Sequence, residues 1–181
     1  MTEGVAATVK FSLGTIGTRQ GRLSSDAGGP YLTAAVTLAQ WFTYSAVVIP
    51  ADFTSGNAGF CALAADAKLL IEFSTTGQVR WTANYGGSNW TATTNTFALN
   101  SPHAVNVFFA WGSELANVDN IAQGTFSANI GTGDGASVAN FVSAPGYGAF
   151  NGYTGEMGLL AGGNAATLAA LSANQKTYWG F

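Results

Sequence analysis

The feature that most constrains the fold is a series of short runs rich in β-branched and aromatic residues, separated by glycine, asparagine, aspartate or proline. Such runs are typical of strands. The clearest is 42–50, Phe-Thr-Tyr-Ser-Ala-Val-Val-Ile-Pro, where two β-branched residues precede a proline that ends a central strand. The other expected strands are 31–38, 58–64, 68–74, 78–85, 90–93, 102–111, 114–123, 126–131 and 150–160. The sequence therefore predicts an all-β chain.

The carboxyl end predicts one strand followed by one short helix. Residues 150–160 alternate as a strand, with Tyr153 and Met157 expected on the same face. Farther on, Ser172 and Gln175 have the S-x-x-Q spacing of a capping box, which predicts a helix that begins there. The chain then ends in Tyr-Trp-Gly-Phe, which we expect to be buried. A strand closed off by a capped helix would plug one end of a β-sandwich.

The closing stretch and two earlier strands resemble one family. Residues 152–160, Gly-Tyr-Thr-Gly-Glu-Met-Gly-Leu-Leu, and 170–175, Ala-Leu-Ser-Ala-Asn-Gln, are similar to the closing signature of concanavalin A-like, laminin-G-like jelly rolls of the prokaryotic and phage type. The last residues resemble the Y-x-x-x-W-G endings of those proteins. The strand at 42–50 resembles their F-T-(I/Y)-S-A-W-V-x-P strand, with valine in place of tryptophan, and 102–111 resembles their W-H-x-V-A strand. The resemblance implies a two-sheet antiparallel β-sandwich, a concanavalin A-like jelly roll, with one short carboxyl-terminal helix.

Length and composition fit one such domain. A chain of 181 residues that is 48% hydrophobic and 13% aromatic is large enough for a single two-layer core. We expect residues 31–181 to form the sandwich and residues 1–30 to form a preceding strand and looped arm, because glycines interrupt this part of the chain. The arm either grips a neighbouring subunit through Arg19 and Arg22 or is a solvated loop.

Charged residues are scarce, and this limits the classes of partner. They make up 8% of the chain, against about 25% in an average soluble domain. A surface poor in lysine and glutamate favours a protein that is packed against neighbours. The net charge of -3 and six scattered basic residues argue against nucleic acid. No apolar run approaches the roughly 18 residues of a membrane span, and no secretory signal is recognisable at the start.

The acidic residues do not form a catalytic pattern. Jelly-roll enzymes that cut glycans place two carboxylates on one face of a strand, one as acid and the other as base or nucleophile. None of the nine acidic residues here is two or four positions from another within an expected strand, and Glu114 and Asp119 are five apart. His103 is the only histidine and no G-x-S-x-G elbow is present, so we expect His103 to be structural. We therefore predict no enzymatic activity, with a carboxylate pair assembled from distant strands as the alternative.

No cofactor is expected. Cys61 is the only cysteine, which leaves no disulfide or thiolate cluster within one chain, and we expect it to be a small buried hydrophobe. Laminin-G-like modules often bind calcium at loop carboxylates, so the resemblance makes Asp66, Asp119 and Asp134 candidates. A hard cation takes several oxygens, whereas isolated acids in glycine-rich turns also serve as turn-formers. Calcium at Asp134 is one alternative, and a structural turn is the other.

An aromatic cluster around 86–87 is the candidate binding site. Sugar rings stack on aromatic faces and take hydrogen bonds from amides, so such a cluster is able to form a glycan platform. The competing interpretation is that its two tryptophans belong to the core of paired strands. The cluster consists of Trp81, Asn84, Tyr85, Asn89 and Trp90.

Two functions are expected from these observations. The first is a non-enzymatic structural or interaction protein on a phage virion surface, such as a capsid decoration or tail-associated protein, with glycan binding for host adhesion. It rests on the low charge, the absent signal and the resemblance. The second is a carbohydrate-binding module of a bacterial cell-surface or secreted system, which rests on fold analogy. In both, the partners are other protein subunits of an oligomeric assembly or cell-surface glycans.

Overall fold

The computed structural model describes residues 2–4, 13–16, 19–24, 31–38, 41–53, 58–64, 69–82, 91–110, 113–126, 135–141 and 150–181, with the backbone alone within 2–38 and 58–70, at 126 and within 135–141. The described strands are β1 (Thr2–Gly4), β2 (Leu13–Ile16), β3 (Arg19–Ser24), β4 (Tyr31–Leu38), β5 (Phe42–Pro50), β6 (Ala58–Ala64), β7 (Leu69–Phe73), β8 (Val79–Thr82), β9 (Thr91–Ala92), β10 (His103–Phe109), β11 (Glu114–Val118), β12 (Ile121–Phe126), β13 (Gly135–Phe141) and β14 (Gly152–Ala161). The helix is α1 (Ala165–Trp179).

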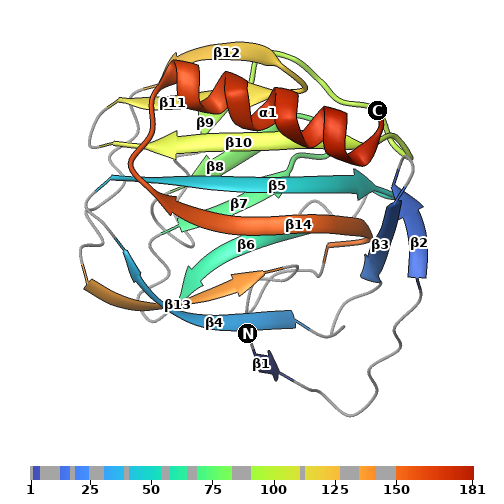
Figure 1. Cartoon of the computed structure of the whole chain (residues 1–181), viewed down its shortest axis with the longest axis horizontal. Coiled ribbons are helices and arrows are strands. Elements are labelled where there is room, and N and C mark those ends of the chain that lie inside the picture. Colours follow the sequence, from blue (N-terminus) through green and yellow to red (C-terminus); the bar gives the residue numbers. More distant parts are fainter. Residues whose placement is uncertain are drawn as a thin grey trace.

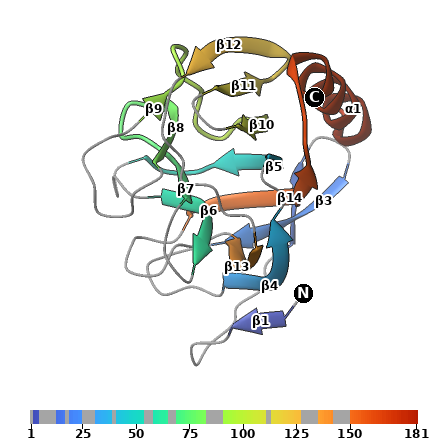
Figure 2. The ribbon, with the colours of Figure 1, turned by 90° about the vertical axis from the view of Figure 1, so that its left-hand side faces the viewer.

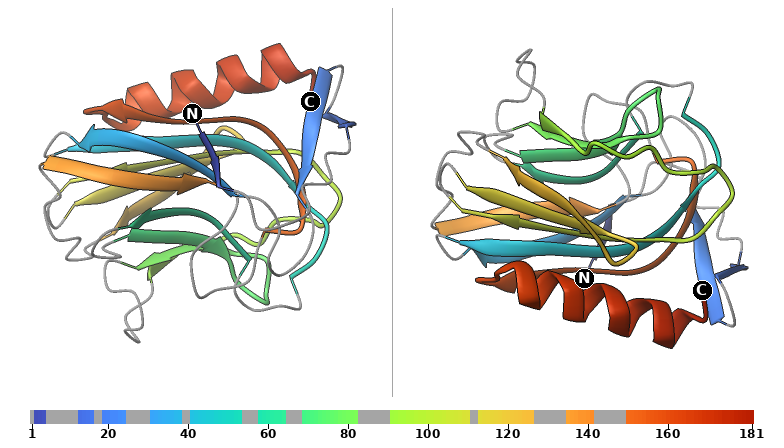
Figure 3. Two further views of the ribbon diagram at one scale, coloured as in Figure 1. Left: turned by 90° about the horizontal axis from the view of Figure 1, so that it is seen from below. Right: turned by 90° about the horizontal axis from the view of Figure 1, so that it is seen from above.

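The strands form two seven-stranded antiparallel sheets that face each other (Figures 1 and 2). Sheet A has the order β1-β4-β13-β6-β7-β8-β9, and sheet B has the order β12-β11-β10-β5-β14-β3-β2. Helix α1 lies on the outer face of sheet B, where it packs on β10, β11 and β12 (Figure 3). This arrangement confirms the predicted two-sheet antiparallel β-sandwich with one carboxyl-terminal helix.

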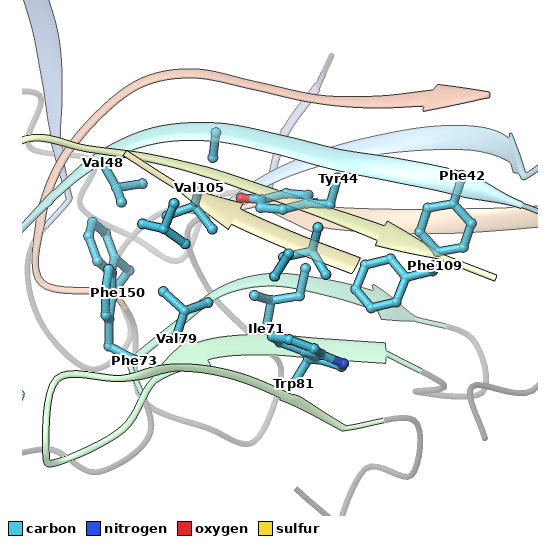
Figure 4. Packing of buried hydrophobic residues seen from close by; sticks show 14 residues of the cluster. Phe42, Tyr44, Val48, Ile71, Phe73, Val79, Trp81, Val105, Phe109 and Phe150 are labelled. Carbon is cyan, nitrogen blue, oxygen red and sulfur yellow. The ribbon is translucent and has the colours of Figure 1, made fainter. Parts of the chain in front are cut away.

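The core lies between β5 and β10 of sheet B and β7 and β8 of sheet A. Alternate side chains of each strand face inward. From sheet B they include Tyr44 and Phe109, and from sheet A they include Phe73 and Trp81 (Figure 4). All nine residues of β5 are buried, because sheet A covers one face of the strand while α1 and flanking side chains cover the other. The strand predicted at 42–50 is thus the central strand of sheet B.

A tight hairpin replaces the single strand expected over 114–123. Asp119 and Asn120 have φ angles of 55° and 69° and connect β11 to β12, whose ends Val118 and Ile121 pair directly. Two successive left-handed residues form the type I′ geometry that matches the twist of a two-residue hairpin. The prediction missed the hairpin because it expected Asp-Asn to continue the strand.

A β-bulge changes the faces of β14. The pairing with β5 shifts register between Thr154 and Met157. As a result Tyr153 packs on the outer face with Trp179, whereas Met157 packs against the main core. The predicted shared face of Tyr153 and Met157 is therefore wrong, because the bulge inserts one residue into the alternation.

Helix α1 begins seven residues before the predicted capping box. Asn164 is the N-cap, and its side chain accepts a hydrogen bond from the Thr167 backbone N–H at 2.9 Å. Ser172 and Gln175 lie inside the helix on its buried face, so the S-x-x-Q spacing does not mark a helix start. Gly180 ends the helix in the left-handed conformation with φ 77°.

Two segments expected to be loops contain strands. β13 lies within the predicted loop over 132–147 and pairs with β4 on one side and β6 on the other. In the predicted arm, β1 pairs with β4 in sheet A, and the β2–β3 hairpin joins sheet B through β14. The glycines that suggested loops are compatible with strands here because neighbouring strands supply the backbone hydrogen bonds.

Substitution of two glycines of β14 by alanine tests the packing of α1 on this strand. A Cβ at Gly155 would lie 2.6 Å from the Trp179 ring, whereas a Cβ at Gly158 would have no atom within 4 Å. We expect Gly155→Ala to lower the free energy of unfolding by about 1–3 kcal/mol, because the ring must move out of a filled space. The matched control Gly158→Ala should stay within about 0.5 kcal/mol of the parent protein. Urea denaturation measures both, and equal effects would contradict this packing.

Candidate functional site

Of the predicted glycan platform, only Trp81 lies within the described residues. Trp81 is fully buried in the core, where its ring meets Phe109 edge-on with centroids 6.3 Å apart. Its indole therefore has no face left for a sugar, which corrects its assignment to the platform. The other members, Asn84, Tyr85, Asn89 and Trp90, lie outside the described residues, as does Cys61 with respect to its side chain.

His103 and Asp119 form a structural link between β10 and the β11–β12 hairpin. The His103 ring places Nδ1 2.6 Å from Asp119 Oδ2 and Nε2 2.9 Å from the Ala98 carbonyl oxygen. The Ala104 backbone N–H donates to the second oxygen, Asp119 Oδ1, at 2.8 Å. Both carboxylate oxygens of Asp119 are thus engaged by protein groups, which supports the structural role predicted for His103.

The described residues include no group of three metal-ligating side chains. Of the calcium candidates, Asp119 serves the hairpin, while Asp66 and Asp134 fall outside the part of the chain that the structure describes. Calcium at Asp134 therefore stays a prediction.

A buried ion pair lies on β7 and β8, on the side of sheet A that faces away from the core. Glu72 and Arg80 are direct cross-strand neighbours, and the Arg80 Nε and Nη2 groups both donate to the single oxygen Glu72 Oε1. The other oxygen, Oε2, is buried without a hydrogen-bond partner. Burial raises the pKa of the Glu72 carboxyl above its ordinary value, although the hydrogen bond and the charge of Arg80 act in the opposite direction.

A polar network joins α1 to sheet B. Ser45 Oγ donates to Asn106 Oδ1 at 2.7 Å, and Asn106 Nδ2 donates to Gln175 Oε1 at 2.9 Å. Gln175 Nε2 closes the ring by donating to Ser45 Oγ at 2.9 Å, and it also donates to Glu156 Oε1 at 2.7 Å. Glu156, on β14, thus connects this strand to the helix.

The outward face of α1 carries a shallow hollow of about 440 Å³ that is largely open to solvent. Its described lining combines the Tyr178 ring, the Asn174 amide, the Thr177 hydroxyl and the Ala173 methyl group. Tyr178 is 49% exposed, and its ring meets the Trp179 ring edge-on with centroids 5.6 Å apart. The hollow therefore offers an aromatic face beside uncharged hydrogen-bonding groups.

Sequence reasoning missed this site because it treated the carboxyl-terminal Tyr-Trp-Gly-Phe as buried. Only Trp179 is buried there, and Tyr178 faces outward. The usable signal was the helical spacing of Ala173, Asn174, Thr177 and Tyr178 at i, i+1, i+4 and i+5, which gathers them on one face of a helix. The capping-box prediction obscured it, because it started the helix too late.

No protein-family model and no curated protein sequence matches the chain. Solved structures do match in fold. Domain 4 of AbnA, a GH43 extracellular arabinanase from Geobacillus stearothermophilus, solved in complex with arabinotriose, has a TM-score of 0.67 at 15% identity, covering 92% of this chain and 82% of that one. A heptameric SAP-like pentraxin from Limulus polyphemus has a TM-score of 0.60 at 11% identity, covering 88% and 79%. Trypanosoma rangeli sialidase has a TM-score of 0.66 at 15% identity, covering 96% of this chain and 29% of its own length.

At these identities the likeness establishes the fold alone. The chain shares its β-sandwich with an arabinanase domain, a pentraxin and part of a sialidase, which confirms the β-sandwich architecture that the sequence resemblance implied. In the described part of the chain, α1 is too short and too polar to span a membrane.

The Glu72 carboxyl should make stability depend on pH. The pKa of Glu72 is higher in the folded state than in the unfolded state, where it is about 4.3. The carboxyl therefore stabilises the fold fully below about pH 4.3, and this contribution to the free energy of unfolding is lost as pH rises. We expect the free energy of unfolding of the parent protein to fall relative to that of Glu72→Gln between about pH 4 and pH 7. Urea denaturation of both proteins across this range measures the difference. The prediction is contradicted if the difference in unfolding free energy between the two proteins stays constant, or if it grows in favour of the parent. Either result would show that the interaction with Arg80 offsets or outweighs burial in setting the pKa of Glu72.

Proposed function

We propose that this chain is a non-enzymatic, lectin-like β-sandwich domain that binds a neutral glycan at the hollow on α1. The observation that carries the proposal is the lining of the hollow, where the exposed ring of Tyr178 stands beside the Asn174 amide and the Thr177 hydroxyl. A sugar ring presents apolar C–H groups to an aromatic face and hydroxyls to amides and hydroxyls. The fold likeness to a domain solved with arabinotriose supports this class of ligand.

The lining favours an uncharged ligand. Thr177 Oγ1 donates to the Ala173 carbonyl at 2.9 Å, which leaves its lone pairs available to a ligand hydroxyl. An amide such as that of Asn174 both donates and accepts, which suits sugar hydroxyls. No charged side chain is among the described lining residues.

Three carboxylates of the described residues serve contacts between elements, which supports a binding function without catalysis. Glu72 bonds to Arg80, Asp119 holds His103 and the Ala104 N–H, and Glu156 bonds to Gln175. A glycosidase needs two carboxyl groups about 5–9.5 Å apart that flank the scissile bond. Each of these three instead stabilises a contact between elements.

Binding to a glycan array, followed by calorimetry, tests the site. The array contains neutral oligosaccharides that include arabinotriose. We expect Tyr178→Ala to weaken the strongest binding at least tenfold, about 1.4 kcal/mol, because the stacking face is lost. Asn174→Ala should weaken it less.

Two variants serve as controls for this experiment. Tyr178→Phe keeps the ring and should retain most of the affinity. Leu99→Ala truncates another exposed side chain, which lies between β9 and β10 and not on α1, and should bind as the parent does. Absence of binding to every neutral glycan, or full binding by Tyr178→Ala, would refute the proposal.

We place this domain in a multi-copy assembly. The setting that the sequence resemblance implies is the surface of a phage virion, as a capsid decoration or tail-associated protein, and an extracellular or cell-surface module is the alternative. The 8% charge content supports close packing against neighbours, since lysine and glutamate are depleted at interfaces.

Analytical ultracentrifugation of the purified chain tests the assembly. We expect a defined oligomer whose contacts bury well over about 1,000 Å², the size of a specific interface. A monomer at all concentrations, still able to bind glycan, would favour the solitary carbohydrate-binding module.

A further inference from the structure

We infer that the glycan site extends along α1, from the hollow at Tyr178 to an exposed tryptophan, Trp41, at the other end of the helix. This rests on the proposed function and specifies its ligand as an extended neutral oligosaccharide. Among the described aromatic side chains, Trp41 and Tyr178 are the two exposed ones, at 53% and 49%. Most tryptophan side chains in proteins are largely buried. One that is half exposed contributes little of its apolar surface to the core, which makes it a candidate for ligand contact.

Trp41 lies beside the amino-terminal end of α1. Its carbonyl oxygen accepts a hydrogen bond from the Gly162 N–H at 2.8 Å, and the helix begins three residues later at Ala165. Trp41 immediately precedes β5, and Thr43, on the outer face of sheet B that also carries α1, donates its hydroxyl to the Gly162 carbonyl oxygen at 2.7 Å. Leu160, which pairs with Thr43, is exposed on this face at 44%.

The flank of α1 that carries Tyr178 faces away from the β11–β12 hairpin. On the hairpin side, Ser172 Oγ accepts from the Asn120 N–H at 2.7 Å and Lys176 Nζ lies 3.5 Å from the Asp119 carbonyl oxygen. Gln175, which bonds to Glu156 of β14, marks the side of α1 that faces this strand. A rotation of 100° per residue puts Leu171 and Tyr178 within about 60° of Gln175 on that side. Thr167 and Asn174 lie nearer to solvent. These four residues, Thr167, Leu171, Asn174 and Tyr178, form the Tyr178 flank.

The outer face of β14 is open over its carboxyl-terminal half. α1 covers β14 at Gly155, where the Trp179 ring packs, and at Glu156, which bonds to Gln175. Farther along the strand, a Cβ built at Gly158 meets nothing within 4 Å, and Leu160 is 44% exposed. There α1 lies over β10, β11 and β12, on the other side of β5 (Figure 1). The surface beside the first turns of α1 is therefore accessible and leads to Trp41, while the Tyr178 hollow lies at the opposite end of the helix.

The chemistry of the Tyr178 flank suits an uncharged chain. The flank has only hydroxyl, amide, aliphatic and aromatic groups, and the Glu156 carboxylate of β14 is engaged by Gln175. At the Trp41 end, Asn164 Oδ1 caps the helix, and no described residue accepts from its Nδ2, which is left as a donor. From Asn164 to Tyr178 the helix rises about 21 Å, at 1.5 Å per residue. A single sugar ring reaches only one end, whereas an oligosaccharide reaches both.

Calorimetry with two length series, linear arabino-oligosaccharides and cello-oligosaccharides, tests the extension. In the parent protein we expect affinity for at least one series to rise tenfold or more from its shortest to its longest member. Trp41→Ala should abolish that rise and leave the shortest ligand unchanged, while Tyr178→Ala should weaken every length. Trp41→Phe keeps a stacking face and should preserve most of the rise, and Leu99→Ala should match the parent.

The outcomes separate the two proposals. A normal length dependence in Trp41→Ala overturns the extension and leaves the Tyr178 site intact. Equal binding by Tyr178→Ala and the parent overturns both. No binding of either series overturns the extension, while the Tyr178 site is then decided by the glycan array. Sedimentation of Trp41→Ala is the last check, because a change of oligomeric state would assign this tryptophan to a contact between copies and overturn the extension.

Discussion

The placement of α1 depends on the closed ring of hydrogen bonds among Ser45, Asn106 and Gln175. All three side chains are buried, and each donates to the next at 2.7–2.9 Å. A buried polar group left without a partner costs about 1–3 kcal/mol, so this ring is satisfied only when β5, β10 and α1 keep one relative position. An apolar helix face would tolerate sliding by part of a turn. The ring, extended by Glu156, does not.

The outer surface of α1 is unusual because it carries small and uncharged side chains, while polar contacts fix the inner face. Two of the four buried positions of α1, Ser172 and Gln175, are polar, and the exposed positions include several alanines. The sequence of α1 therefore lacks the usual contrast between an apolar inner and a charged outer face. Its single basic residue, Lys176, lies on the hairpin side. A helix of this kind presents small and uncharged groups to solvent, which is the surface that the proposed glycan site uses.

The sequence predicted elements whose signals are local and missed those that depend on pairing. β5 was predicted to the residue, because its β-branched run and terminal proline constrain the strand whatever its neighbours are. The low strand propensity of Gly135-Ala-Ser-Val predicts a loop where β13 lies, and pairing with β4 and β6 overrides that preference. The bulge in β14 and the true start of α1 were missed for a related reason. Gly155 accommodates Trp179 and Gln175 meets Asn106, and both are contacts between distant segments.

The candidate site was not predicted from the sequence for the same reason, because it depends on which surfaces are covered by distant segments. Sequence reasoning made Trp81 a candidate for ligand contact and expected Tyr178 to be buried, whereas Trp81 is buried and Tyr178 is exposed. Composition does not tell which face of a strand or helix is covered. Among the described side chains of β7 and β8, those that face away from the core are Glu72, Arg80 and Thr82, and Glu72 and Thr82 are buried. Around α1 the described aromatic rings remain accessible at both ends. A ligand that stacks on aromatic rings is therefore served by the helical side of the sandwich, and the polar ring beneath α1 is what holds Tyr178 and Trp41 at a fixed separation.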